Sequence, residues 1–408
     1  MKTANRSRSA ILVGCILGIA SGVLAQDWSQ WMGANRDGKA VGFKAPATWP
    51  KELNQKWKVT VGKGDATPAL VGEKVFVFAR DDQGEITLCL DAATGKELWR
   101  DSYEVQAANE PMGKHPGPRS SPTVVDGRVL AYGVRGTLSC LNAADGKVLW
   151  RKDDLGGVFP RFFTSSSPLV AEGLCIAQLG GEEKGGIYAY ALANGDLKWK
   201  WTDDGSGYAS PSLLSVGDVK MVVALTSKRL VGLSLSDGKL LWEAAFAPAG
   251  RAYNAATPIV DGSTVIFSGS GRGTKAVKIE KMGDAFTAKE LWSNSDNAVQ
   301  FNTPVLKSGL LYGLSQKGDL FCLGAKDGKT LWSSPMGAKD FGSLVDAGSV
   351  LMAIGTQGEL TIFEPGEKEF KKVASYKVTQ TEMYAYPVPA GNHLFIKDKD
   401  SLIRWDVD

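Results

Sequence analysis

A short pattern that ends in tryptophan recurs along this chain of 408 residues and constrains its fold more than any other feature. Residues 89–99 read CLDAATGKELW, and residues 140–150 read CLNAADGKVLW. In every full copy a small residue comes first, glycine follows six positions later and tryptophan ten positions later. Full copies occupy residues 89–99, 140–150, 189–199, 232–242 and 322–332. A looser copy ends at Trp292, and two degenerate copies end at Trp57 and Tyr376.

A second pattern precedes each copy. It consists of Ser/Thr-Pro, a short apolar run, a turn containing glycine, and another apolar run, as in SSPTVVDGRVLAYG at residues 120–133. Clear versions occupy residues 66–79, 120–133, 166–179, 209–225, 256–269 and 302–315, and weaker ones 341–355 and 385–398. Short alternating runs rich in β-branched residues, separated by Gly and Asp turns, predict strands rather than helices.

The two patterns together define a unit of four short strands, repeated every 40–51 residues. Such a period with a recurring tryptophan is typical of a β-propeller. Eight first strands are present, but the chain ends one strand short, after SLIRWDVD. We therefore predict an all-β, eight-bladed propeller of four-stranded blades, in which residues 55–61 (QKWKVTV) close the ring. The predicted domains are a signal peptide (1–25), a Trp-rich leader (26–53) and the propeller (54–408).

The repeated Gly-Lys dipeptide could also belong to a phosphate-binding loop. GAKDGKT at residues 324–330 comes closest to that motif, but it has three residues between its glycines instead of four and leads into a strand. We therefore interpret the glycine as part of a hairpin turn and the aromatic residue as an anchor that docks one blade on its neighbour. The predicted anchors are Trp57, Trp99, Trp150, Trp199, Trp242, Trp292, Trp332 and Tyr376.

The cysteines follow the repeat. Cys89, Cys140 and Cys322 occupy one equivalent position in three units, and Cys175 lies within an apolar run. Equivalent positions in separate blades are too far apart for a disulfide, so we predict buried free thiols.

The N-terminus has the form of a secretory signal. MKTANRSR is basic, AILVGCILGIASGVLA is apolar and ends in small residues, and cleavage is expected near Ala25. A retained membrane anchor and a lipoprotein cleaved at Cys15 are the alternatives. Removing the three basic residues of this segment from the chain's 47 leaves 44, equal to the 44 acidic residues. This balance argues against a nucleic-acid partner. No other segment is long and apolar enough to cross a membrane, and we expect an extracytoplasmic monomer.

The repeated A-x-D-x-x-[TD]-G-K-x-x-W pattern resembles the pyrroloquinoline-quinone (PQQ)-type repeat over residues 54–408. The leader DWSQWMGANRDG at residues 27–38 resembles the segment that precedes such propellers in secreted members. This family includes quinoprotein dehydrogenases and BamB-type outer-membrane assembly factors, both eight-bladed. The resemblance to the assembly factors implies a non-catalytic binding or scaffold protein without a cofactor or metal. Its partner would be a protein or peptide in the periplasm or at the cell surface. The alternative is a quinoprotein-like oxidoreductase that binds PQQ and calcium.

Candidates for catalysis are few. The dehydrogenases of this family usually carry a disulfide between adjacent cysteines, and this chain has no adjacent pair. The acidic pairs Asp81–Asp82 and Asp203–Asp204 are interpreted as solvated turns. His115 and His393 lie in different units without metal-ligand spacing and are interpreted as surface or packing residues. GSGRGT at residues 269–274 is interpreted as a hairpin turn rather than a dinucleotide loop.

A binding site is predicted where the chain enters the first strand of each unit, because these segments face one end of a propeller's channel. They carry arginines, amides and aromatic rings that could grip an acidic or planar ligand or an extended peptide. The predicted residues are Arg119, Arg161, Tyr208, Arg251, Tyr253, Asn254, Phe301, Asn302, Phe341, Tyr384 and Tyr386.

Overall fold

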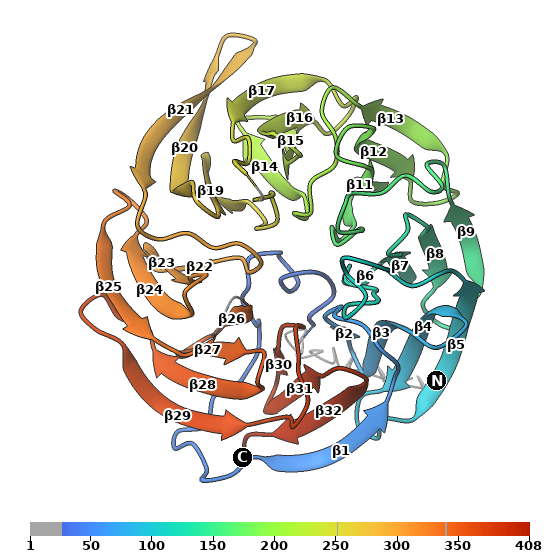
Figure 1. Ribbon diagram of the computed structural model, residues 1–408, viewed down its shortest axis with the longest axis vertical. Helices are drawn as coiled ribbons and strands as arrows, with labels where there is room; N and C mark the ends of the chain where they lie inside the picture. The colour runs from blue at the N-terminus through green and yellow to red at the C-terminus, as the bar shows by residue number, and fades with distance from the viewer. Residues whose placement is uncertain (1–26, 251, 339–340) are drawn as a thin grey trace, which may run out of the picture.

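Eight four-stranded antiparallel sheets surround a central channel in the computed structural model of the chain (Figure 1). The structure describes residues 27–250, 252–338 and 341–408. The predictions of a signal peptide, of cleavage near Ala25 and of lipidation at Cys15 lie outside these residues. The predicted all-β, eight-bladed propeller is confirmed.

Each blade runs from a short strand beside the channel to an outer strand at the rim (Figure 1). The first four blades are formed by β2 (Ala69–Val71), β3 (Lys74–Arg80), β4 (Gly84–Asp91) and β5 (Glu97–Glu104); β6 (Thr123–Val125), β7 (Arg128–Tyr132), β8 (Leu138–Asn142) and β9 (Val148–Lys152); β10 (Leu169–Ala171), β11 (Leu174–Gly180), β12 (Gly185–Ala191) and β13 (Leu197–Trp201); and β14 (Ser212–Val216), β15 (Val219–Leu225), β16 (Arg229–Ser234) and β17 (Leu240–Ala245). The other four are formed by β18 (Ile259–Asp261), β19 (Thr264–Gly269), β20 (Gly273–Met282) and β21 (Ala285–Asn294); β22 (Val305–Lys307), β23 (Leu310–Leu314), β24 (Asp319–Gly324) and β25 (Thr330–Pro335); β26 (Gly342–Ala347), β27 (Val350–Gly355), β28 (Glu359–Glu364) and β29 (Lys371–Lys377); and β30 (Val388–Ala390), β31 (His393–Lys397), β32 (Ser401–Asp406) and β1 (Asn54–Thr60).

Burial along the strands follows their place in the blade. The two middle strands are covered on both faces by neighbouring blades, so β3 and β4 are buried over nearly their whole length. The outer strand β5 is largely exposed except at Trp99. Continuous apolar runs therefore specify the middle strands, and a single aromatic residue fixes the outer strand to the core.

The N-terminal strand closes the ring. β1 pairs antiparallel with β32, from Asn54 opposite Asp406 to Thr60 opposite Ser401. The first and last strands of the described chain thus share one sheet, and each of the eight blades has four strands. This confirms the predicted closure.

Tryptophans on outer strands lie against the next blade. The indole N–H of Trp99 donates to the carbonyl of Ala143 at 3.1 Å, and its ring covers Gly146 in the following hairpin turn. The same donation, to the first residue after the third strand of the next blade, is made by Trp57, Trp150, Trp199 and Trp292 at 2.9–3.3 Å. Trp332 donates at 2.9 Å to Gly366, the second residue after β28. The Gly-Lys turn is therefore a seat for the tryptophan of the preceding blade.

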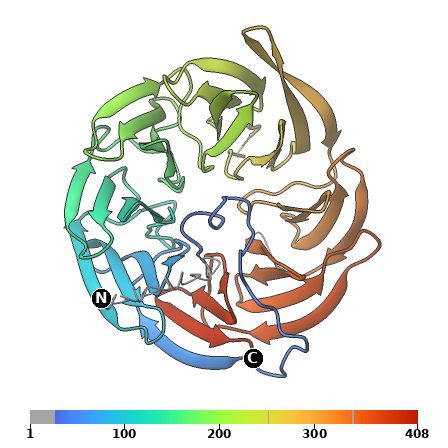
Figure 2. The ribbon, with the colours of Figure 1, turned by 180° about the vertical axis from the view of Figure 1, so that it is seen from behind.

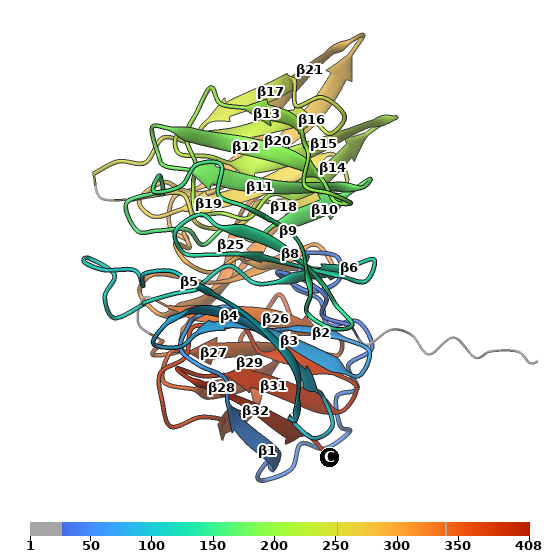
Figure 3. The same ribbon diagram turned by 90° about the vertical axis from the view of Figure 1, so that its right-hand side faces the viewer.

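Two anchors depart from this arrangement. The blade that follows Trp242 has a longer β20–β21 hairpin in place of the Gly-Lys turn, and the Trp242 indole instead contacts the Met221 sulfur at 3.2 Å within its own blade. The Tyr376 hydroxyl donates to the Pro50 carbonyl at 2.6 Å, so the leader takes the place of a turn there. The β20–β21 hairpin extends beyond the ring, and its tip residue Met282 is 69% exposed (Figure 3).

The four cysteines among the described residues are free and buried, as predicted. The prediction of a solvated turn is wrong for Asp204, which is buried. Its carboxylate accepts hydrogen bonds from the Thr226 hydroxyl at 2.6 Å and the Lys228 amide at 2.9 Å. The chain folds back over this turn and provides the donors, so Asp204 holds two loops together.

His393 packs as predicted. Its Nδ1 lies 2.7 Å from an Asp406 carboxylate oxygen, between the last two strands. Within the described part of the chain, no helix is long and apolar enough to cross a membrane.

Candidate functional site

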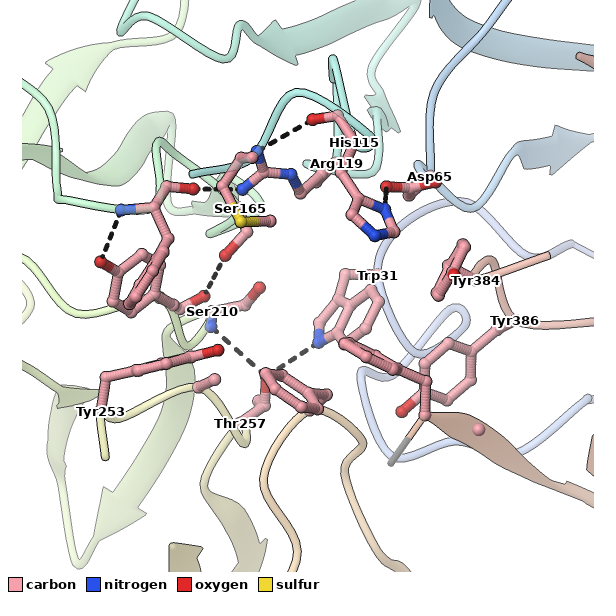
Figure 4. Close-up of a pocket in the computed structure, with 17 residues that line it drawn as sticks. Trp31, Asp65, His115, Arg119, Ser165, Ser210, Tyr253, Thr257, Tyr384 and Tyr386 are labelled. Atoms are coloured by element: carbon pink, nitrogen blue, oxygen red, sulfur yellow. Dashed lines mark hydrogen bonds and ion pairs between the residues drawn. The ribbon is translucent and has the colours of Figure 1, made fainter. Parts of the chain in front are cut away.

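A pocket of about 320 Å³ lies at one mouth of the channel (Figure 4). It is built by the segments that lead into the innermost strands, here called the lead-in segments, together with one turn of the leader. Seven of the predicted site residues line it: Arg119, Tyr208, Tyr253, Phe301, Phe341, Tyr384 and Tyr386. The structure therefore brings together residues that lie up to 267 positions apart in the sequence.

A series of hydrogen bonds from blade to blade holds the lead-in segments in place. Six residues that each precede a proline donate their backbone N–H to the side-chain oxygen of the corresponding residue farther along the ring, as Ser121 does to Ser167 at 2.9 Å. The series continues through Ser210, Thr257, Thr303 and Tyr386 and ends at Thr67, with distances of 2.9–3.3 Å. Proline keeps the preceding residue extended, which leaves its N–H free to reach the next blade. The Ser/Thr-Pro pattern is thus the signature of this series of hydrogen bonds.

The leader occupies the channel, where the sequence alone does not place it (Figures 1 and 2). Trp28 is fully buried and pairs with Leu70 of the innermost strand β2. The Arg36 guanidinium donates to the Pro168 carbonyl at 3.0 Å across the ring. Trp31 lines the pocket, donates to the Thr257 hydroxyl at 2.9 Å and packs edge-on against Tyr386. The leader therefore closes the pocket on its channel side.

Aromatic rings form a continuous arc around the pocket. Phe301 and Phe341 stack with their centroids 4.1 Å apart, and Tyr384 meets Phe341 edge-on at 5.3 Å. On the other side Tyr253 lies 5.8 Å from Phe301 and 4.9 Å from Phe162. Both stacked and edge-on contacts are favourable arrangements for aromatic pairs. Each of these five rings comes from the lead-in segment of a different blade, so the arc depends on the propeller's symmetry.

Arg119 closes the arc and supports its neighbours. Its guanidinium donates to the carbonyl of Phe162 and, at 3.2 Å, to that of His115. Burial lowers the pKa of the guanidinium below its ordinary value. Since two of its nitrogens are bonded to carbonyls of the pocket rim, Arg119 positions two loops as well as lining the pocket.

Asp65 and His115 form a polar pair in the wall of the pocket. Neither residue is among those predicted for the site from the sequence. His115 Nδ1 lies 3.0 Å from the Asp65 carboxylate, and its ring meets Tyr384 edge-on at 4.6 Å. A signal for both was present in the sequence. Asp65 lies two residues before Thr67, in the first lead-in segment, and His115 precedes the second Ser/Thr-Pro.

The remaining predicted residues lie outside this pocket. Arg161 and Asn254 line a neighbouring pocket of about 270 Å³ over blades three to five. Asn302 is buried and donates to the Leu314 carbonyl at 2.8 Å, so it holds its lead-in segment. Arg251 lies outside the described residues.

Burial affects the titration of the pocket's phenols. It raises the pKa of both Tyr384 and Tyr386 to about 12, and it also raises the pKa of Tyr208 above its ordinary value. Their hydroxyls therefore stay protonated at neutral pH. The Tyr208 hydroxyl donates to Glu182 at 2.6 Å, and the Tyr386 hydroxyl accepts the Thr303 N–H.

The oxygen ligands of this pocket do not suit calcium. Calcium takes six to eight oxygen ligands, typically with several carboxylates. Asp65 is the one carboxylate among the described lining residues, and it is already paired with His115. Elsewhere in the described chain, too, no group of three or more His, Cys, Asp or Glu side chains is close enough to hold a metal ion.

Comparisons with known proteins show which family and which solved structures this chain resembles. Residues 50–154 and 82–334 match the family described as outer membrane protein assembly factor BamB. The protein of that name from Burkholderia pseudomallei is 26% identical over 364 residues, which cover 86% of each chain.

Two solved structures are similar at lower identity. BamB from Moraxella catarrhalis has a TM-score of 0.64 at 13% identity, covering 87% of this chain and 97% of its own. The quinohemoprotein alcohol dehydrogenase from Comamonas testosteroni has a TM-score of 0.66 at 15% identity, covering 94% and 80%. At such identities both likenesses show a shared fold and do not distinguish binding from catalysis.

Proposed function

The chain belongs to the family of the outer membrane protein assembly factor BamB, and from that premise we propose that it is a non-catalytic binding protein of the cell envelope. Its role would be in the assembly of outer-membrane or cell-surface proteins. Relatives of that name match the chain over most of its length, which supports this role above others.

The observation that carries the proposal is the pocket at the channel mouth. The leader closes it on one side, an arc of aromatic rings surrounds it, and a series of hydrogen bonds joins the lead-in segments that build it. Concave sites lined by aromatic rings with few polar groups are the usual form of a binding site. A rigid ring of this kind suits the capture of a partner.

We further propose that the protein works without PQQ, calcium or another cofactor. The pairing of Asp65 with His115 supports this, because it leaves little carboxylate oxygen for a calcium ion in the pocket. The experiment is to incubate the purified protein with PQQ and calcium and to record the quinone spectrum and dye reduction with alcohols or sugars. No bound quinone and no reduction are expected. A bound quinone with turnover would overturn the proposal in favour of an oxidoreductase.

The assembly role is tested by capture from an envelope fraction. The wild-type protein should retain outer-membrane proteins, whereas a Phe301→Ala/Phe341→Ala variant should retain less. A control variant, Phe370→Ala, removes a half-buried ring far from the pocket, where Phe370 packs on Trp332. Equal capture by both variants would contradict a role for the channel mouth.

A further inference from the structure

We propose that the pocket and its neighbour together hold a polypeptide segment in which an aromatic side chain stands beside an acidic residue. This inference rests on the proposed function and names the chemistry of the partner. It follows from three features of the described residues: the surface that the first pocket offers, the charge of the second, and the wall that joins them.

The first pocket offers mainly ring surface. Its hydroxyls are largely engaged within the protein: Ser165 donates to the Tyr208 carbonyl at 3.1 Å, and Thr257 accepts from Trp31. Tyr208 and Tyr386 are engaged as described above. A sugar or a small acid needs free donors and acceptors, and few remain. An aromatic side chain needs ring faces and edges, and these line the pocket on three sides.

The second pocket is polar and basic. Arg161 and Lys228 both line it and are exposed, and the one acid among its described lining residues is Glu182. Glu182 already accepts the Tyr208 hydroxyl. Two cations against one engaged carboxylate favour an occupant with negative charge. The Arg161 guanidinium also lies 5.2 Å from the Phe162 ring, which holds it over the rim.

The two pockets share a wall of three rings, Phe162, Tyr208 and Tyr253. An occupant that fills the first pocket and reaches the second must therefore pass over these rings. A polypeptide does this readily, because adjacent residues can place a ring on one side and a carboxylate on the other. A small aromatic acid carries both groups on a shorter frame and is the alternative that the test separates.

The test is fluorescence polarisation with labelled, end-capped hexapeptides added to the purified protein. One peptide contains Phe-Asp between Gly and Ser residues, one contains Leu-Asp and one contains Phe-Asn. The Phe-Asp peptide should bind saturably. The Leu-Asp peptide should bind about fivefold more weakly, and the Phe-Asn peptide about two- to fivefold more weakly. Equal binding of all three peptides, or no saturable binding, would overturn the inference.

Competition with N-acetylphenylalanine separates a polypeptide from a small aromatic acid. The peptide should bind on the order of tenfold more tightly, because it also contacts the shared wall. A small acid that binds as tightly as the peptide would overturn the assignment of a polypeptide.

Two sets of variants test which pocket holds the aromatic side chain of the peptide and which holds its carboxylate. Phe341→Ala should weaken the Phe-Asp peptide about fivefold or more, with Phe370→Ala as the matched control. If Phe341→Ala lowers the melting temperature, Phe301→Leu keeps the apolar volume and removes only a ring. The pair Arg161→Gln/Lys228→Gln should abolish the preference for Asp over Asn. Its control, Lys198→Gln/Lys200→Gln, removes two exposed lysines from β13 and should preserve that preference.

Failure of this inference can be told from failure of the proposed function. If the protein captures outer-membrane proteins but binds none of the three peptides, the inference is contradicted and the proposed function is supported. Peptide binding without capture of any envelope protein would contradict the proposed function and leave the inference about the peptide supported.

Discussion

The indole ring of Trp99 lies directly on Gly146 of the next blade: a Cβ atom on Gly146 would stand 2.5 Å from the ring. The backbone of Gly146 also has a φ of +75°, which side-chain-bearing residues rarely adopt. Both facts follow from a hairpin turn that serves as the seat for a neighbouring tryptophan.

Gly146→Ala should therefore destabilise the protein more than its backbone conformation alone requires. Gly127→Ala is the matched control, because Gly127 has a φ of +69° with open space where the Cβ would stand. The control should cost about 1–2 kcal/mol, and Gly146→Ala a further ~1–3 kcal/mol from the clash with Trp99. Urea denaturation measures both, and equal costs would show that the contact with Trp99 adds nothing.

The series of lead-in hydrogen bonds predicts the cost of losing one hydroxyl. Thr303→Val keeps the shape of a buried side chain but removes the oxygen that accepts the Thr257 N–H at 3.0 Å. The free energy of unfolding should fall by about 1–3 kcal/mol, because a buried donor loses its partner. Ser121→Ala is the control, since the Ser121 hydroxyl is buried without a partner among the described residues. A control that costs as much as Thr303→Val would contradict this account.

Because Trp57 lies where the ring closes, its replacement should strongly destabilise the fold. The ring of Trp57 lies 5.9 Å from Phe395 and its N–H donates to the Ala92 carbonyl, so it joins the last blade to the first. Trp57→Ala should lower the free energy of unfolding by about 2–4 kcal/mol, and Trp57→Phe by less. A melting temperature within about a degree of the wild type would refute this role.

The burial of Lys397 predicts that the free energy of unfolding depends on pH. Its ammonium group is fully buried and donates to the carbonyls of Gly62 and Gly64 at 3.1 Å and of Asp398 at 2.8 Å. Burial lowers its pKa from 10.5 to about 8. Between these pH values the unfolded chain binds more protons than the folded one, so stability contributed by this residue rises with pH.

The measurement is the free energy of unfolding of the wild type and of Lys397→Met at pH 7.5 and pH 10. Groups that titrate in both proteins cancel in the difference. From pH 7.5 to pH 10, the free energy of unfolding of the wild type should rise by roughly 2–3 kcal/mol relative to that of the variant. No gain, or a loss, would show that Lys397 keeps its ordinary pKa in the fold.

The fold was predictable because its determinants are local and repeated. A turn glycine and an anchoring tryptophan recur at fixed spacing, so their register counts the blades without knowledge of long-range contacts. Trp242 departs from the pattern because its partner turn carries an insertion, which shows that each anchor depends on the following blade. Asp204 was misjudged because its donors, Thr226 and Lys228, come from another part of the chain.

The site was predictable only in part. Aromatic residues in the lead-in segments could be assigned to the channel mouth from the repeat alone, and Tyr253, Phe301 and Phe341 do line the pocket. The contribution of Trp31 could not be assigned, because nothing local in the leader indicates that it enters the channel. The hydrogen bonds of Arg119 to two backbone carbonyls likewise depend on how neighbouring loops fold.

The most direct test of the central claim, that the channel mouth binds envelope polypeptides, is photo-cross-linking in living cells. A photoreactive benzoylphenylalanine replaces Tyr253 at the shared wall in one strain and Phe370 away from the pocket in another. The account predicts cross-links to outer-membrane polypeptides from position 253 and few from position 370. Cross-links that are absent at position 253, or equally frequent at both positions, would contradict it.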